Sequence, residues 1–259
     1  MNILEEIAEK TQIRVEEAKK HQSLSALRKL AEGAGGDTGF PFEKALAGEG
    51  LSFICEVKKA SPSKGIIAKD FPYVEIAKQY EAAGASALSI LTEPYYFQGS
   101  NDYLREIRKE VSLPILRKDF TVDEYMIYEA KVLGADAVLL ICAILTDEQL
   151  TAYGQLARSL GLSALVEAHD EEEVQRAIAS GASIIGVNNR NLKDFTVDIQ
   201  NSVRLRTLVP KEILFVSESG IKTKEDTAKL KENGTDAVLV GETLMRSGNI
   251  AETLKELRG

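Results

Sequence analysis

Four segments of this 259-residue chain repeat one pattern, in which a helix end is followed by a glycine and then by an apolar strand. The segments are AAGASALSIL, VLGADAVLLI, ASGASIIGVN and ENGTDAVLVG. Their glycines, Gly84, Gly134, Gly181 and Gly234, stand where a helix needs a C-terminal residue at positive φ. The repeat length of about 50 residues fits one β-α-β-α unit.

Between these strands lie four more apolar runs, near residues 53–58, 113–118, 162–167 and 212–217, each followed by a stretch with helical periodicity. Eight β-α units predict an α/β fold, a (βα)₈ TIM barrel, which typically takes ~250 residues. An open doubly wound sheet shares this pattern, and we favour the barrel. Residues 1–50 form an N-terminal helical extension to a single barrel domain spanning 1–259. That extension either braces the barrel or caps one of its ends.

Composition limits the classes of partner. The net charge is −8 and the isoelectric point is near 5.1, without a basic cluster, so we expect no nucleic acid and no membrane as partner. No segment has the apolar length of a signal peptide or a membrane span. Cys55 and Cys142 lie inside apolar strand runs and are expected to be buried hydrophobes. We therefore expect a cytoplasmic protein with no obligatory protein partner.

Five apolar runs end on ionisable or amide residues, and this predicts a catalytic site. These residues are Glu56, Lys58, Lys118, Glu167, Asn188, Arg190 and Glu218. In a barrel the active site lies at the C-terminal ends of the strands, where inward-facing residues converge. A salt-bridge network that only neutralises charge is the alternative for any one of them. Two lysines and two glutamates are expected to converge there, and such a set favours acid-base catalysis. They are Glu56, Lys58, Lys118 and Glu167.

The scarcity of histidine limits which side chains can transfer protons. The chain has only His21, in the extension, and His169, two residues after Glu167. His169 could share the inward face with Glu167, but a loop histidine is the favoured interpretation. Proton transfer then falls to lysine and glutamate. Neither metal-ligand spacing nor a dinucleotide fingerprint is found in the sequence, so we expect no metal and no cofactor.

The loops after the last two strands, SESGIKT and VGETLMRSG, predict a phosphate site. Ser219, Gly220, Gly241 and Glu242 lie in them, and residues 243–245 could form the short helix that often binds phosphate in barrels. Tight turns are the alternative reason for the two glycines. An aromatic ring could lie among four apolar side chains, Phe97, Phe120, Leu139 and Leu192, although ordinary packing at the barrel rim also explains them.

Seven motifs occur in the same order as in a known family: EVKKASPSKG, LTEPYYFQGS, LPILRKDF, LVEAH, GVNNRNL, VSESGI and VGETLMR. With them, the chain resembles indole-3-glycerol phosphate synthase along essentially its whole length. The resemblance implies a cofactor-free lyase of tryptophan biosynthesis. Its substrate would be 1-(2-carboxyphenylamino)-1-deoxyribulose 5-phosphate, a phosphorylated small molecule that undergoes ring closure, decarboxylation and dehydration.

The resemblance also implies roles for the residues. Lys118 would be the general acid of ring closure, Lys58 would hold the substrate carboxylate, and Glu167 would act as base or stabilise an iminium. Glu56 would orient the lysines, Asn188 and Ser219 would hold hydroxyls, and Glu218 would support them. Arg190 and the loops at Gly220, Gly241 and Glu242 would take the phosphate. Ala60 stands where some relatives have lysine, so Ser61 and Lys58 are expected to suffice.

Two other functions are consistent with parts of the pattern. A barrel similar to phosphoribosylanthranilate isomerase would be expected to use a Cys/Asp pair at strand ends, whereas Cys55 and Cys142 lie within strands. A non-catalytic sensor of phosphorylated metabolites would not need opposed acids and bases. We also hypothesise that the SPSKG loop after the first strand closes over the substrate.

Overall fold

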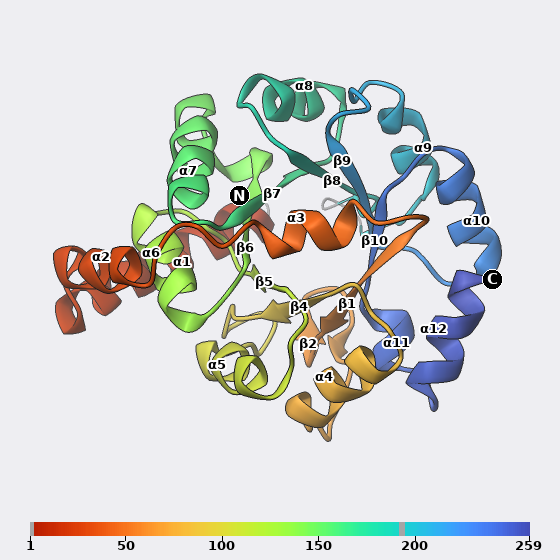
Figure 1. The fold of residues 1–259 in the computed structure, drawn as a ribbon, viewed down its shortest axis with the longest axis horizontal. Coiled ribbons are helices and arrows are strands. Elements are labelled where there is room, and N and C mark those ends of the chain that lie inside the picture. Colours follow the sequence, from red (N-terminus) through yellow and green to blue (C-terminus); the bar gives the residue numbers. More distant parts are fainter. Residues whose placement is uncertain (1–2, 192–194) are drawn as a thin grey trace.

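The computed structural model describes residues 3–191 and 195–259, and its centre is a closed barrel of eight parallel strands (Figure 1). Around the barrel the strands follow the order β1-β10-β9-β8-β7-β6-β5-β4. The strands are β1 (Ser52–Val57), β4 (Ala87–Leu91), β5 (Ile115–Lys118), β6 (Ala137–Ile141), β7 (Ser163–Ala168), β8 (Ile184–Asn188), β9 (Leu214–Glu218) and β10 (Ala237–Val240). The predicted barrel is confirmed, and the open sheet is excluded because β1 pairs with β10.

Helices surround the barrel and connect its strands. They are α4 (Tyr73–Ala82), α5 (Asn101–Glu110), α6 (Glu124–Leu133), η1 (Cys142–Ile144), α7 (Asp147–Ser159), α8 (Glu171–Ala179), α9 (Gln200–Arg206), α10 (Lys224–Glu232), α11 (Glu242–Met245) and α12 (Ile250–Arg258). Short polar side chains start many of them by accepting a backbone N–H, as Thr146 does from Gln149 at the start of α7. The four repeat glycines have φ values of 81°, 89°, 80° and 81°, as predicted for helix C-termini.

Side chains alternate between the barrel interior and the helix layer. Ile54 on β1 belongs to the interior cluster with Leu116 and Leu165. Cys55 and Val57 instead pack in the outer cluster with Tyr80 of α4, which confirms their predicted outward orientation. This period of two leaves Glu56, between them, facing the interior.

The N-terminal extension reaches both ends of the barrel. It contains α1 (Ile3–His21), α2 (Leu24–Gly33) and α3 (Pro41–Leu46). Phe42 and Leu46 of α3 are buried in the interior cluster and close the N-terminal end of the strands, the end facing the viewer in Figure 1. Ile7 of α1 is buried at the opposite end, and α2 packs against α6. The extension therefore braces the barrel and also contributes side chains to the C-terminal end of its strands.

The segment after β1 forms a small hairpin. Its strands are β2 (Ala60–Ser61) and β3 (Gly65–Ile66), paired antiparallel. The hairpin includes the predicted SPSKG loop, and Lys64 Nζ lies 3.8 Å from Glu242 Oε1 at the start of α11. The segment after β1 is thus ordered beside the loop that follows the last strand.

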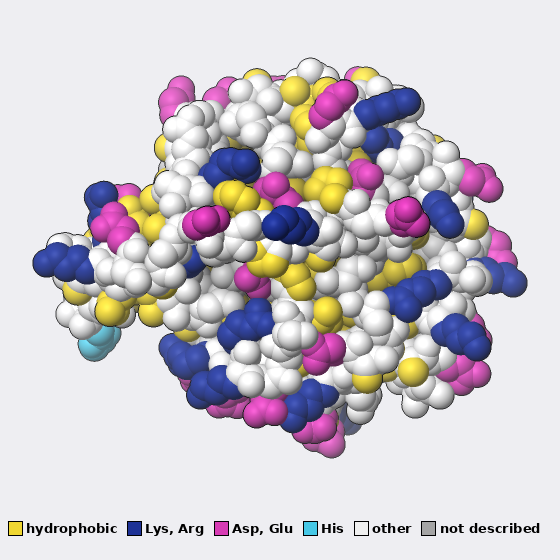
Figure 2. Space-filling view, in the orientation of Figure 1, with side chains coloured by type: hydrophobic (Ala, Val, Ile, Leu, Met, Phe, Trp, Pro, Cys, Tyr) yellow, Lys and Arg dark blue, Asp and Glu magenta, His cyan; other side chains and the backbone are white. Residues whose placement is uncertain are grey.

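The surface carries mixed charge. On the face shown in Figure 2, lysine and arginine side chains are interspersed with aspartate and glutamate, and neither sign covers a large continuous area. No helix in the described part of the chain has both the length and the apolar character needed to cross a bilayer.

If α3 stabilises the barrel by filling its N-terminal end, Phe42→Ala should lower the free energy of unfolding by about 3–5 kcal/mol, because it leaves a cavity in the interior cluster. Urea unfolding followed by circular dichroism measures this. The control is Leu30→Ala on α2, since Leu30 is 54% exposed and its truncation should change stability by less than about 0.5 kcal/mol. Equal effects of the two substitutions would contradict the role assigned to α3.

Candidate active site

A cavity of about 430 Å³ opens at the C-terminal ends of the strands. It brings together fifteen of the predicted site residues: Glu56, Lys58, Ser61, Phe97, Lys118, Phe120, Leu139, Glu167, Asn188, Arg190, Glu218, Ser219, Gly220, Gly241 and Glu242. The sixteenth, Leu192, lies outside the described residues. The convergence predicted from the strand ends is therefore present in the structure.

Lys118 at the end of β5 is the central cation of this cavity. Its Nζ lies 3.2 Å from Glu167 Oε2 on β7 and 3.7 Å from Glu218 Oε2 on β9. Burial opposes the charged form, but the charges of Glu167, Glu218 and Glu56 outweigh it and raise the pKa of Lys118. Lys118 is thus protonated before any ligand arrives, and it is placed to donate a hydrogen bond or a proton into the cavity.

The two carboxylates beside Lys118 differ in protonation. Burial alone would raise the pKa of Glu167, but the charges of Lys118 and His169 outweigh it and hold the pKa below its ordinary value. For Glu218, burial dominates over the attraction of Lys118 and, with repulsion from Glu167 and Glu56, raises the pKa to about 8. Its Oε1 is buried without a hydrogen-bond partner. Near neutral pH the site thus pairs an ionised with a largely protonated carboxyl group.

Glu56, which faces inward from β1, and Lys58, directly after the strand, form a second ion pair, in keeping with the shared inward face that their spacing predicts. Glu56 is buried, whereas the Lys58 side chain keeps 17% of its surface exposed toward the cavity. A Cβ atom at Gly241 would collide with the Glu56 carboxylate. A glycine is therefore needed at this position to make room for the ion pair. This requirement is separate from the predicted binding of phosphate by the Gly241 backbone.

An apolar wall faces these charges. The rings of Phe97 and Phe120 lie with centroids 6.2 Å apart, and Leu139 of β6 packs in the same cluster. Ile3, Leu4 and Ile7 of α1 extend the wall, which the sequence did not predict residue by residue. A flat apolar group placed here would lie directly beside Lys118.

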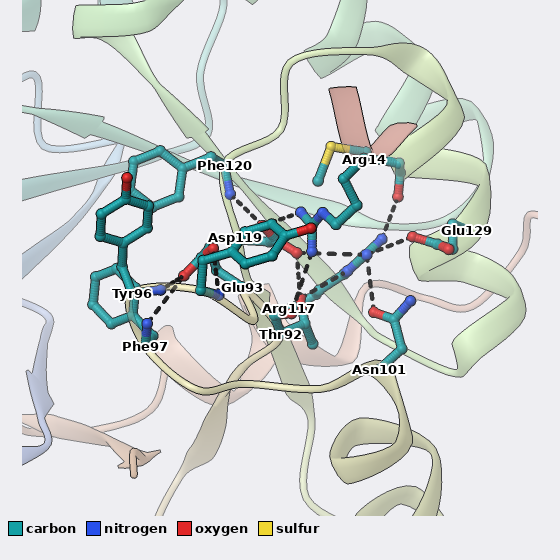
Figure 3. A network of polar contacts seen from close by, with 12 residues as sticks. Arg14, Thr92, Glu93, Tyr96, Phe97, Asn101, Arg117, Asp119, Phe120 and Glu129 are labelled. Carbon is teal, nitrogen blue, oxygen red and sulfur yellow. Dashed lines mark hydrogen bonds and ion pairs between the residues drawn. The ribbon is translucent and has the colours of Figure 1, made fainter. Parts of the chain in front are cut away.

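A network of buried polar contacts holds this wall in place (Figure 3). Glu93 accepts hydrogen bonds from the backbone N–H groups of residues 95, 96 and 97, at distances of 2.7–3.0 Å. Asp119 accepts from the Phe120 N–H at 2.8 Å, from Thr92 at 2.6 Å and from Arg14 of α1 at 2.7 Å. Two carboxylates therefore fix the loops that carry the two phenylalanine rings.

Four cationic side chains also line the cavity, from the hairpin after β1 and from the segments after β8, β9 and β10. They are Lys64, Arg190, Lys222 and Arg246. The Asn188 carboxamide oxygen accepts the Arg190 N–H at 3.0 Å and so fixes the start of this segment. Ser219 and Gly220 both have positive φ, 69° and 85°, which turns the chain sharply after β9. Helix α11 begins at Glu242 and includes the predicted residues 243–245.

The sequence did not identify several cavity residues. Lys64, Lys222 and Arg246 lie in polar segments, where a single cation in the sequence does not indicate a binding site. Asp119 follows Lys118 directly, but its partner Arg14 is 105 positions away. Among the described residues, no group of three or more His, Cys, Asp or Glu side chains is arranged to hold a metal ion.

Solved structures share the fold at low sequence identity. Thiamine phosphate pyrophosphorylase from Pyrococcus furiosus superposes with a TM-score of 0.59 at 17% identity, covering 84% of this chain and 96% of that one. A chain of the tryptophan synthase a2b2 complex from Pyrococcus furiosus gives 0.58 at 14% identity, covering 80% and 97%. At these identities the likeness concerns the barrel alone.

Sequence relatives are much closer. The family model for indole-3-glycerol phosphate synthase matches residues 4–257. The relative named indole-3-glycerol phosphate synthase from Ruminiclostridium cellulolyticum is 58% identical over 99% of both chains, and the one from Endomicrobium trichonymphae is 55% identical over 99% of both. Because the family match spans the barrel, its extension and every strand end that faces the cavity, the chain belongs to the indole-3-glycerol phosphate synthase family.

Proposed function

We propose that this cavity converts 1-(2-carboxyphenylamino)-1-deoxyribulose 5-phosphate to indole-3-glycerol phosphate, with Lys118, Lys58 and Glu167 as the principal acid-base groups. The observation that carries the proposal is the placement of Lys118. Its ammonium group lies between Glu167 and Glu218 and beside the apolar wall of Phe97 and Phe120. A proton donor next to a site for an aromatic ring is what ring closure onto that ring requires.

In ring closure, the aromatic carbon that bears the carboxylate attacks the ribulose carbonyl carbon. A carbon–carbon bond forms, and the carbonyl oxygen takes a proton from Lys118 to become a hydroxyl. Lys58, whose side chain remains partly exposed to the cavity beside Glu56, pairs with the substrate carboxylate until it leaves as CO₂. The bonding electrons then restore the aromatic ring. Glu56 balances the charge of the lysines and orients them.

Dehydration completes the reaction. The hydroxyl formed in ring closure leaves as water after taking a proton from an acid, for which Lys58 is suited by its position. Glu167 stabilises the iminium that develops and accepts the proton whose loss gives the indole; its pKa lies below the ordinary value, so it is ionised and able to do both. Asn188 and Ser219 hold substrate hydroxyls, and Glu218 supports them.

The rest of the cavity fits the rest of the substrate. Phe97, Phe120, Leu139 and the undescribed Leu192 receive the aromatic ring, and Ser61 supplements Lys58. Arg190 and the backbone at Gly220, Gly241 and Glu242 take the phosphate. The Glu242 carboxylate would repel it, but Arg246 Nε at 3.1 Å and Lys64 Nζ at 3.8 Å offset that charge. This scheme requires no metal and no cofactor.

We further propose a cytoplasmic location without an obligatory protein partner. Cys55 and Cys142 are free and buried, with pKa values that burial raises to about 12. Neutral buried thiols are typical of proteins in a reducing compartment.

Lys118→Ala should lower kcat by ~10²- to 10⁴-fold with little change in substrate affinity, because it removes a proton donor that acts in the transition state. The measurement is the rise of indole fluorescence on mixing enzyme with substrate in EDTA, with affinity taken from binding to the inactive variant. Lys29→Ala on the exposed face of α2 is the control. Wild-type turnover in the Lys118 variant would remove Lys118 from the mechanism, and loss of wild-type activity in EDTA would contradict the metal-free scheme.

Glu218 should make stability depend on pH. Its folded-state pKa of about 8 exceeds its ordinary value of 4.5, so the folded protein holds a proton that the unfolded chain has lost between these values. Binding of this proton raises the free energy of unfolding. That contribution is present at acidic pH and is lost as the pH rises toward 8. Thermal unfolding of Glu218→Gln and wild type from pH 5 to 9 should show wild type losing stability relative to the variant, then a constant difference above pH 8.

The exposed Glu9→Gln on α1 serves as the control for this experiment, because it removes one carboxylate that does not line the cavity. A constant difference between wild type and Glu218→Gln across the whole range would show that Glu218 is ionised throughout.

Arg190→Gln should raise KM for the phosphorylated substrate by about tenfold or more, because a charge-assisted hydrogen bond to phosphate is lost. The same substitution should leave KM for the dephosphorylated substrate close to that of wild type. Arg204→Gln on α9 is the matched control, since Arg204 is an exposed arginine paired with Glu171. An equal rise in KM for both substrates would place Arg190 away from the phosphate.

A further inference from the structure

His169, which directly follows β7, lies between two carboxylates. Its Nδ1 is 3.0 Å from Glu173 Oε2, and its Nε2 is 3.5 Å from Glu167 Oε1. The same Glu173 oxygen accepts the backbone N–H of His169 at 2.8 Å. The imidazole ring is thus fixed through both its main chain and its side chain, with its second nitrogen turned toward Glu167.

These contacts determine where the ring carries its protons. A carboxylate can only accept, so the Nδ1 that faces Glu173 carries a hydrogen. A neutral ring would then direct the Nε2 lone pair toward a carboxylate oxygen, and Nε2 is buried without a hydrogen-bond partner. The protonated ring directs an N–H toward Glu167 instead. Burial opposes this cation, but the hydrogen bond to Glu173 and the charges of Glu167 and Glu173 outweigh it and raise the pKa of His169.

Glu173 occupies a helix position that suits a carboxylate. It lies in the first turn of α8, where Asp170 accepts its backbone N–H at 2.9 Å. The positive end of a helix dipole favours a carboxylate at this position. The cation on His169 is therefore balanced locally, and it adds no net charge to the cavity.

Glu167 consequently lies between two cations. Its Oε2 faces Lys118 Nζ at 3.2 Å from β5, and its Oε1 faces His169. Glu56 from β1 also acts on Lys118 through its charge, and Glu218 from β9 adds to the negative charge on both neighbours only at the pH values where it is ionised. Cys142 in η1, whose charge would be felt by Glu167, stays neutral because burial raises its pKa to about 12.

We propose that His169, anchored by Glu173, is a positioning residue that keeps Glu167 ionised and correctly oriented throughout the reaction. The inference rests on the proposed function, in which Lys118 gives up a proton during ring closure. At that moment Lys118 no longer carries a charge, and His169 is the neighbouring cation that remains to hold Glu167 as the base for the later step. His169 does not touch the substrate in this scheme.

The first test measures the protonation of His169 without reference to activity. The chain has only two histidines, so NMR titration of the ring protons gives two curves, and His21→Asn assigns them. We expect the pKa of His169 to lie above the ordinary histidine value of about 6.5 and to fall in Glu173→Gln. An ordinary value in wild type, or no fall in Glu173→Gln, would overturn the proposal.

The second test uses His169→Asn, which keeps an N–H donor for Glu173 but removes the charge beside Glu167. If Glu167 must be ionised, the acid limb of the pH profile of kcat/KM should move to higher pH by about half a unit or more. His21→Asn should leave the profile unchanged. An unmoved acid limb in a folded His169→Asn enzyme would overturn the proposal.

Failure of the proposed function is distinguishable from failure of this inference. Wild-type turnover in Glu167→Gln would remove Glu167 as the base, whereas the NMR titration of His169 would still give its own result. Loss of turnover in Glu167→Gln, together with a shifted acid limb in His169→Asn, would support both.

Discussion

The ammonium group of Lys118 is the interaction on which the architecture of the cavity depends. A buried cation is tolerated only where carboxylates surround it, and here they come from β7, two strands from β5, and from β9 on the opposite side of the barrel. Only a closed barrel brings these strand ends together. With Glu218 largely protonated, Lys58 and Lys118 offset Glu56 and Glu167, while Glu173 offsets His169. The inner set of charges around Lys58 and Lys118 is thus close to balanced, whereas Lys64, Arg190, Lys222 and Arg246 add positive charge to the rest of the cavity lining.

The sequence was sufficient for the barrel and for most of the cavity, because both follow from periodicity. Strand residues alternate with a period of two, so Glu56 had to face inward once Cys55 and Val57 faced the helices. Contacts that depend on loop geometry were not predictable. The approach of His169 to Glu173 requires the bend after β7 and the first turn of α8, and the favoured interpretation of His169 as an ordinary loop histidine missed it. Gly241 was assigned only to phosphate or a turn, yet its backbone also makes room for Glu56.

The extension links the stability of the barrel to the shape of its site. Phe42 fills the N-terminal end, whereas Arg14 of α1 pairs with Asp119 at the other end. That ion pair is buried on the Asp119 side, so its loss would leave the carboxylate next to Phe120 with Arg117 as its remaining ion-pair partner, at 3.6 Å. The network in Figure 3 therefore makes the extension part of the apolar wall.

Closure of the barrel between β1 and β10 has a consequence for the order of assembly. Ser52 pairs with Ala237 and Cys55 with Val240, so these contacts join residues from opposite ends of the barrel sequence. Such non-local pairing forms slowly and requires almost the whole chain. Glu56 meets the Gly241 loop only at this last junction. A growing chain on the ribosome can therefore hold most of its helices and strands while it still lacks a complete active site. The site is completed only when β10 pairs with β1.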